Sequence, residues 1–291
     1  MRMVASAKLH HAQSMTEKFL LYKDELEKTI DSLQLTADSS MRQKDQQGES
    51  QLSTLNSQLS TLLIPISSNS GLCGAYNSNI TKATLQRIEE LESQGKKVRL
   101  LPIGKKIAHD LQNKGFDCNI GYFNLLERIE KDSSFAEVTF LVEFILQLHQ
   151  SGEIDHVEFL HHHFKSMGSQ VIQVDNLQLT ADSSMGQGAR GREQGASQLS
   201  TFNSQLSTFL TEPSPEELLT ILRPRLLNAQ TYGFLLSSLA SEHAARMMAM
   251  QTADENASEL LKELRLLYNK TRQQAITNEL IDIMGSQVGR R

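Results

Sequence analysis

The sequence predicts an α/β fold combined with long helices: an antiparallel coiled coil of the N- and C-terminal helices with a Rossmann-like α/β domain between them. Apolar residues recur at coiled-coil spacing near both ends of the 291-residue chain. In the middle, short apolar runs alternate with helical patterns, which is typical of a largely parallel sheet with crossover helices. Aromatic residues make up only 5% of the chain and tryptophan is absent, which favours long helices over a compact all-β core.

The bulk composition argues against several classes of protein. The net charge is -5, from 29 basic and 34 acidic residues, so there is no basic field and no nucleic-acid partner is expected. No apolar run approaches the roughly 18 residues that span a bilayer, and the start "MRMVASAKLHHAQ" lacks the apolar centre of a signal peptide. Cys73 and Cys118 are too few for a disulfide framework, which predicts a cytosolic chain with reduced thiols.

The N-terminal helix is predicted over residues 1–33. Steps of four and three residues give a mostly apolar seam of Met1, Ala5, Lys8, Ala12, Met15, Phe19, Tyr22, Leu26, Ile30 and Leu33. One helix cannot bury such a seam alone. The pattern therefore predicts a partner helix elsewhere in the chain.

A repeated segment follows this helix and recurs after the middle of the chain. The nonapeptide "LQLTADSSM" occupies residues 33–41 and again 177–185, and "QLSTLNSQLSTLL" or "QLSTFNSQLSTFL" follows. Two distant copies do not make a solenoid, which needs adjacent repeats. Their polar composition predicts low-complexity insertions over 34–60 and 177–210. A pair of partner-binding strands is the alternative, but the leucine spacing suits neither a strand nor a helix.

The α/β domain is predicted over residues 61–176. In order, the pattern shows a strand "LLIPI", a helix "NITKATLQRIEELESQG", a strand "VRLLPIG" and a helix "KKIAHDLQNKG". A long helix "FAEVTFLVEFILQLHQSG" comes next. The domain ends with two strands around the turn "KSMGS" in "IDHVEFLHHHFKSMGSQVIQVD".

The loop "SNSGLCGAYNSNI", residues 68–80, joins the first strand to the first helix, where phosphate sites lie in doubly wound sheets. It contains neither glycine-rich nucleotide fingerprint nor a basic residue, so no nucleotide or other cofactor is expected. No histidine lies within 30 residues of Cys73, which predicts a small buried thiol rather than a nucleophile. Asn77, Ser78 and Asn79 are predicted to cap the following helix.

The run His161–His163 raises the possibility of a metal site. In a strand, at most His161 and His163 share a face, and neither a cysteine nor a carboxylate lies at ligand spacing. We therefore expect a surface or partly covered strand and no metal.

The C-terminal helix belongs to the segment 211–291. Between Pro224 and Met284 there is no further proline and Gly233 is the one internal glycine, so a helix of more than 50 residues is predicted from about Tyr232. Its seam runs from Leu236 and is broken at Asp254. Two such seams at opposite ends of one chain predict an antiparallel coiled coil.

Three segments together resemble the gamma subunit of bacterial F-type ATP synthase: "MRMVASAKLHHAQ", "SGLCGAYNSNI" and "LASEHAARMMAMQTADENASELLKELRLLYNKTRQQAITNELIDI". The resemblance covers the chain except the two repeat segments. It implies a central rotor stalk, one copy per complex, whose coiled coil lies inside a ring of alpha and beta subunits. The α/β domain would sit at the foot with the epsilon subunit and the c-subunit ring. Proton transport would drive ATP synthesis on the beta subunits, and this peripheral chain on the cytoplasmic face of the inner membrane would hold no catalytic site.

The resemblance also assigns subunit contacts, residue by residue. Arg272 and Gln273 match the contact with a beta-subunit loop, where the arginine fork can pair with a carboxylate and release it. The remaining matches are Met1, Arg2 and Lys8 toward the same ring, Glu242, His243 and Arg246 in "SEHAARM", and Gly71, Leu72, Cys73 and Gly74 in the strand-to-helix turn near subunit contacts.

Two alternatives stay open at this point. A nucleotide-using α/β enzyme with a helical arm predicts ligand binding by the isolated chain. A nonfunctional truncated gamma-like product predicts a chain that does not assemble. The resemblance implies that relatives begin several helical turns before the position of Met1, so we expect either an upstream start or a coiled coil partly unpaired at its tip.

Overall fold

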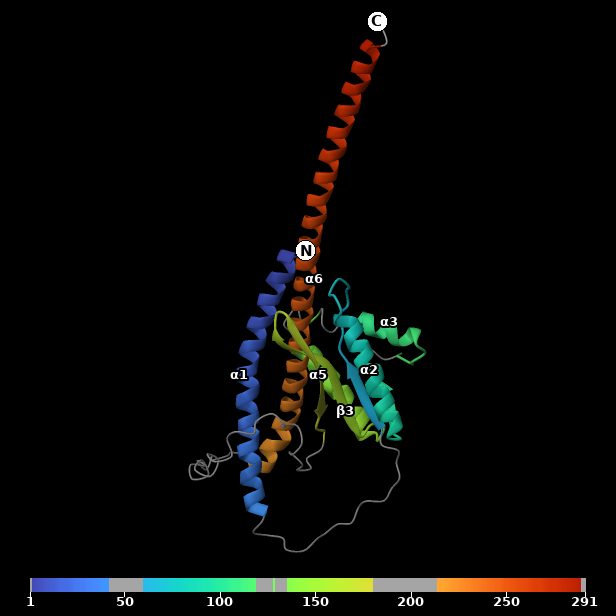
Figure 1. The fold of residues 1–291 in the computed structure, drawn as a ribbon. Helices are drawn as coiled ribbons and strands as arrows, with labels where there is room; N and C mark the ends of the chain where they lie inside the picture. The colour runs from blue at the N-terminus through green and yellow to red at the C-terminus, as the bar shows by residue number, and fades with distance from the viewer. Residues whose placement is uncertain (1, 42–59, 119–127, 129–134, 180–213, 289–291) are drawn as a thin grey trace, which may run out of the picture.

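The computed structural model describes residues 2–41, 60–118, 128, 135–179 and 214–288. Two long helices, α1 (Arg2–Met41) and α6 (Pro215–Val288), run side by side, and the α/β domain lies against them (Figure 1). Helix α6 extends well beyond the start of α1 (Figure 1). The predicted combination of terminal helices and a central sheet is confirmed.

The helix pair α1 and α6 is antiparallel. Ala12 packs with Leu239 and Ala240. Further along α1, Ile30 and Leu33 pack with Leu219, which lies earlier in α6. Residue numbers therefore rise along α1 as they fall along α6, as the two seams predict.

The predicted seam of α1 is wrong at two positions. Lys8 is exposed and Leu9 is fully buried in its place, while Tyr22 is 51% exposed. Ala5, Ala12 and Leu33 stay buried at a strict seven-residue repeat, so the stripe keeps the predicted period and the misses are at the positions between them.

Helix α6 begins earlier than the sequence predicts. It starts at Pro215 instead of about Tyr232 and has 74 residues, with Pro224 inside it. Pro215 needs no hydrogen-bond partner for its nitrogen at the first helical position, and the Ser214 hydroxyl accepts from the Glu217 amide at 3.4 Å. Packing of Leu219 against α1 offsets the hydrogen bond that Pro224 cannot donate.

The structure describes only the ends of the two predicted insertions. Helix α1 continues past Leu33 to Met41, so the first nine residues of the first repeat copy are helical. Residues 42–59 and 180–213, which hold most of both predicted insertions, lie outside the described residues.

The sheet has four strands in the order β2-β1-β3-β4. The strands are β1 (Ser60–Pro65), β2 (Lys97–Leu100), β3 (His156–Ser166) and β4 (Ser169–Leu177). Strand β1 pairs in parallel with β2 and β3, and β4 pairs antiparallel with β3. The connecting helices are α2 (Tyr76–Ser93), α3 (Lys105–Asn113) and α5 (Ala136–Gln150), in the predicted order.

Each face of the sheet is covered by helices. Leu63 and Leu160 face Ile80 of α2 and Ile107 of α3 in one core cluster. On the other face, residues of the sheet such as Phe159 share a core with α5 and with Leu235 and Leu236 of α6. Helix α6 therefore packs both against α1 in the helix pair and against the sheet in the core of the domain.

Beyond the domain, α6 continues alone. Every residue from Gln251 to Met284 is exposed, and we call this stretch the exposed half of α6. It is the long segment that extends away from the rest of the molecule in Figure 1. Among the described residues, no helix is apolar enough over a sufficient length to cross a bilayer.

Candidate functional site

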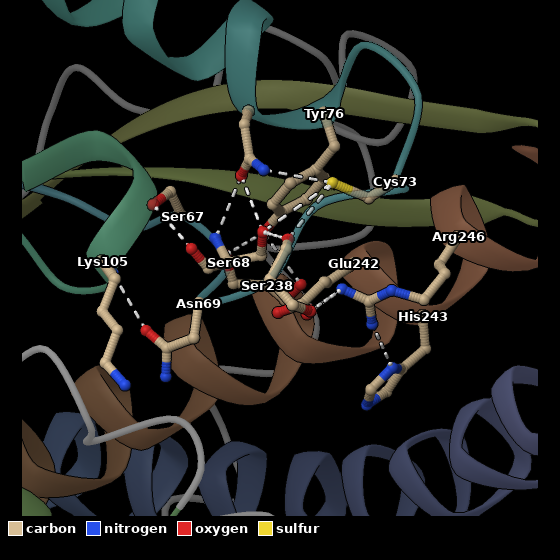
Figure 2. Close-up of polar contacts among 12 residues, drawn as sticks. Ser67, Ser68, Asn69, Cys73, Tyr76, Lys105, Ser238, Glu242, His243 and Arg246 are labelled. Atoms are coloured by element: carbon tan, nitrogen blue, oxygen red, sulfur yellow. Dashed lines mark hydrogen bonds and ion pairs between the residues drawn. The ribbon is translucent and has the colours of Figure 1, made fainter. Parts of the chain in front are cut away.

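Two groups of residues that the sequence analysis names separately meet in space. The loop between β1 and α2 lies against α6 at Glu242 and Arg246 (Figure 2). The Arg246 guanidinium donates to the Glu242 carboxylate at 2.7 Å and to the Ser70 hydroxyl at 2.8 Å. It also lies 3.4 Å from Nδ1 of His243. We call Arg246, Glu242 and Ser70 the Arg246 clamp.

The loop has an unusual backbone at its centre. Gly74 has a φ of +58° and Leu72 a φ of +62°, a left-handed conformation that costs a residue with a side chain about 1 kcal/mol or more. Leu72 is also 68% exposed. The turn predicted from the sequence therefore presents an apolar side chain to solvent on a strained backbone.

Internal hydrogen bonds hold the loop in this shape. The amide and hydroxyl of Ser68 both donate to Oδ1 of Asn77, at 3.1 and 2.9 Å. The Asn77 side-chain amide donates to Sγ of Cys73 at 3.2 Å. Cys73 is a buried free thiol, as the sequence predicts.

The predicted helix cap is wrong. Helix α2 begins at Tyr76 with Ala75 at the cap position, and no side chain bonds the first turn there. Asn77 already lies inside the helix and bonds the preceding loop instead, while Ser78 donates to the Ala75 carbonyl at 3.0 Å. The asparagine side chain shapes the loop rather than capping the helix.

Tyr76 connects α2 to α6. Its hydroxyl lies 3.1 Å from both the carbonyl and the hydroxyl of Ser238. Its ring stacks on His162 with centroids 4.0 Å apart. Burial raises the pKa of the Tyr76 phenol well above its usual value, and burial together with His161 lowers the pKa of His162 to about 4.

Serine side chains of α6 bond the backbone of β3 where the neighbouring strand has ended. Strand β1 ends at Pro65, opposite Leu160, but β3 continues to Ser166. There the Phe164 amide donates to Oγ of Ser237 at 3.2 Å. The hydroxyls of Ser237 and Ser241 lie 3.4 and 3.2 Å from the His162 carbonyl. Helix α6 thus satisfies backbone groups that a strand would otherwise pair.

The expectation of a surface or partly covered strand at His161–His163 is wrong for two of the three residues. His161 and His162 are both 2% exposed, because α6 and α2 cover opposite faces of β3. Nε2 of His161 lies 2.7 Å from the Asp175 carboxylate. Among the described residues, no three His, Cys, Asp or Glu side chains are grouped so as to hold a metal.

The other predicted contact residues lie away from the clamp. Arg272 and Gln273 are exposed on the outer part of α6, and Lys8 is exposed on α1. Arg2 lies in α1, but its side chain and all of Met1 are outside the described residues. The structure therefore brings the loop and the "SEHAARM" segment together and leaves the remaining predicted contacts separate.

Sequence reasoning missed Ser70, Tyr76 and the buried serines of α6. Ser237, Ser238 and Ser241 are fully or almost fully buried where α6 packs against the domain. The available signal was that Ser237 and Ser241 adjoin the seam positions Leu236 and Ala240, because a hydroxyl beside a buried seam needs a hydrogen-bond partner.

A cavity of about 400 Å³ lies between α1, the β3–β4 pair and α6. Its lining includes His161, Asp175, Phe234 and Phe19. None of the predicted contact residues lines it. The cavity and the predicted contact surface are separate parts of the molecule.

Comparison with known proteins places this arrangement in a family. A family model described as ATP synthase matches residues 1–287. The ATP synthase gamma chain of Parabacteroides distasonis is 38% identical over 287 residues, covering 98% of this chain and 90% of the relative. The chain belongs to the ATP synthase gamma family. The gamma chain of Bacteroides fragilis is 37% identical over 289 residues, covering 99% of this chain and 92% of that one.

Solved structures agree with the family in fold. The central stalk and c-ring structure of the Tetrahymena thermophila mitochondrial ATP synthase contains a chain with a TM-score of 0.58 and 24% identity, covering 87% of this gamma family chain and 97% of that one. A chain of the Euglena gracilis mitochondrial enzyme has a TM-score of 0.51 and 21% identity, covering 98% and 95%. Because relatives match along nearly the whole sequence, a nonfunctional truncated product is not favoured.

Proposed function

We propose that this gamma family chain is the central rotor stalk of an F-type ATP synthase. It turns inside a ring of alpha and beta subunits and couples transmembrane proton flow to ATP synthesis on the beta subunits. The observation that carries the proposal is the exposed half of α6, which projects from a folded domain in a chain of this family. A projecting helix of this kind needs surrounding subunits to cover its apolar residues, such as Leu264 and Leu267.

The fold suits the transmission of torque. Helix α6 has 74 residues and is about 110 Å long at 1.5 Å per residue. Its first part is packed into the domain core and against α1, and its last part is the exposed half. A rotation of the α/β domain is therefore carried along one continuous helix to the region where the ring would surround it.

The proposal places each partner at a part of the molecule. The alpha and beta subunits surround the exposed half, where Arg272 and Gln273 meet a beta-subunit loop, with Arg2 and Lys8 near the same ring. The epsilon subunit and the c-subunit ring bind the α/β domain. One copy acts in each complex, peripheral on the cytoplasmic face of the inner membrane, and ATP is bound and made on the beta subunits rather than on this chain.

Co-expression tests the proposal. The full chain would be produced with the alpha, beta and epsilon subunits of the same genome, isolated through a tag on beta, and assayed for ATP hydrolysis. The matched control is a chain ending at Met250, which keeps the buried contacts of α6 and lacks its exposed half and residues 285–291. We expect an active complex with the full chain and none with the control. Absence of the full chain from the isolated complex would contradict the proposal.

A further inference from the structure

We propose that Arg246 is a positioning residue that clamps the Ser70–Gly74 loop to α6, so that the loop and the exposed half of the helix present one rigid surface to the surrounding subunits. The inference rests on the proposed stalk function. It concerns how the stalk holds its shape at the point where the helix leaves the domain.

The clamp joins parts of the chain that are distant in sequence. Arg246 and Glu242 are one helical turn apart on α6, and their side chains are only 18% and 8% exposed. The carboxylate is nearly buried, so it needs the guanidinium as a partner and thereby fixes the guanidinium's orientation. The same guanidinium nitrogen then reaches Ser70, which lies 176 positions earlier in the chain.

The loop touches α6 on both sides of its strained centre. Ser70 bonds Arg246 on one side of Leu72. On the other side, a Cβ placed on Gly74 would lie 3.9 Å from Cβ of Ala249. Leu72, with a φ of +62° and 68% exposure, stands between these two supports. A strained backbone persists when its surroundings hold it in place, and the Arg246–Ser70 hydrogen bond adds to the internal bonds of the loop here.

The location gives the clamp its role. Ala249 lies two residues before the exposed half of α6 begins at Gln251. Leu72 therefore projects at the base of the helix segment that the ring surrounds. Release of the loop would leave α6 unchanged and alter only the position of Leu72 relative to it.

The test uses the assembled complex in inverted membrane vesicles, with ATP hydrolysis and ATP-driven proton pumping measured together. Ser70→Ala removes the loop's side of the clamp and leaves the Arg246–Glu242 pair intact. We expect pumping per ATP hydrolysed to fall about two- to tenfold, the range for loss of one typical intramolecular hydrogen bond, because Ser70 is exposed. Ser70→Thr keeps the hydroxyl and should restore pumping. Ser78→Ala is the matched control, because that exposed hydroxyl bonds only the local Ala75 carbonyl.

Hydrogen exchange on the same complexes separates positioning from general stability. We expect faster exchange of the Ser68 amide, which donates to Asn77 within the loop, in Ser70→Ala, with the melting temperature unchanged. Arg246→Gln combined with Ser70→Ala should pump no worse than Arg246→Gln alone, since both changes open the same clamp.

The outcomes are distinguishable. If the wild-type complex neither assembles nor pumps, the proposed function fails. If the wild type pumps and Ser70→Ala pumps equally well, or if its loss is accompanied by a lower melting temperature or is not restored by Ser70→Thr, the clamp is overturned.

Discussion

His162 is buried between elements from different parts of the chain. It lies in β3 between the ring of Tyr76 and the serines of α6, and it is 2% exposed. Nothing in the run of three histidines distinguishes it from its neighbours. Its low pKa arises because two helices from different parts of the chain exclude water from its ring.

His162 predicts a pH-dependent stability. Its pKa falls from 6.5 to about 4 on folding, mainly through burial. Between these values the unfolded chain binds a proton that the folded chain does not, so stability is complete above about pH 6.5 and falls by about 3 kcal/mol as the pH drops to about 4. Urea unfolding of the full chain from pH 4 to 7 measures this.

The variant His162→Gln should remove most of this dependence of the unfolding free energy on pH. His163, whose pKa is also lowered by burial, leaves a smaller dependence of the same sign. His109→Gln, which changes an exposed side chain of helix α3, is the control and should keep the wild-type profile. A slope that survives unchanged in His162→Gln would contradict the assignment.

At Gly104, the addition of one methyl group should strongly lower the free energy of unfolding. Its φ is +104°, and a Cβ there would lie 2.3 Å from the carbonyl oxygen of buried Ser67. Gly104→Ala should cost more than about 2 kcal/mol of unfolding free energy, because both the backbone conformation and the contact are unfavourable. The measurement is urea unfolding of the purified chain.

Gly71 provides the comparison, since nothing lies within 4 Å of a Cβ placed there. Gly71→Ala should change the unfolding free energy by less than about 0.5 kcal/mol. Equal effects at the two glycines would show that crowding by Ser67 does not matter.

At the scale of elements, the contact between α6 and β3 is the most informative. A helix usually packs on a sheet through apolar side chains, yet here Ser237 and Ser241 bond the backbone of β3 beyond the end of β1. Small hydroxyl side chains allow the helix to approach the strand closely. The helix thereby secures the strand that also carries His162.

The double variant Ser237→Ala and Ser241→Ala tests this contact. It leaves the His162 carbonyl and the Phe164 amide without these partners, at about 1–3 kcal/mol for each unsatisfied buried group. Unfolding free energy should fall accordingly, and amide exchange at Phe164 should accelerate.

The control for this pair is Ser258→Ala in the exposed half of α6, which should alter neither quantity. If the Phe164 amide exchanges at the wild-type rate in the double variant, the two serines do not protect the backbone of β3.

The start of α6 shows a limit of sequence reasoning at the same scale. Proline is a strong signal for the end of a helix, and Pro224 placed the predicted start near Tyr232. In the structure, the helix passes through Pro224 because Leu219 packs on Ile30 and Leu33 of α1. Packing between α1 and α6 therefore outweighs the roughly 3 kcal/mol by which proline is less favourable than alanine inside a helix.

At the scale of the whole molecule, the chain consists of a packed part and a projecting part. The packed part joins α1, the sheet and the first portion of α6. The projecting part carries exposed apolar residues such as Leu260, Leu264 and Tyr268. This division suits a shaft whose outer end is covered by other subunits.

Arg272→Ala tests the contact proposed for the outer end. The residue is exposed, so its removal should leave the melting temperature of the chain unchanged. In the assembled complex, ATP-driven proton pumping should fall about tenfold, as for a lost hydrogen bond between charged groups worth about 1.4 kcal/mol.

Lys262→Ala, also exposed on α6, is the matched control and should pump as the wild type does. Wild-type pumping in Arg272→Ala would count against a role of this residue in coupling.

Much of the fold was predictable because it depends on local periodicity. The strand and helix order of the domain and the antiparallel helices follow from apolar spacing that can be counted along the chain. The candidate site was predictable only in pieces. The turn around Cys73 and the segment around Arg246 were both identified, but no local pattern indicated that Ser70 would bond Arg246.

The repeated nonapeptide shows where the local sequence stops determining the structure and tertiary packing decides it. Its first copy, Leu33–Met41, is the end of helix α1, where Leu33 packs against Leu219. The second copy begins at Leu177, the last residue of strand β4, which pairs with Val157. The same leucine is helical in one place and extended in the other because its packing partners differ.

The sequence by itself determined most elements and their order, since each depends on spacing within one segment, and the two apolar seams at opposite ends of the chain predicted that the terminal helices pair. The tertiary structure decided where α6 begins, which histidines are buried and how Ser70 meets Arg246. Those features depend on contacts between segments far apart in the chain, and such contacts exist only after the elements have packed.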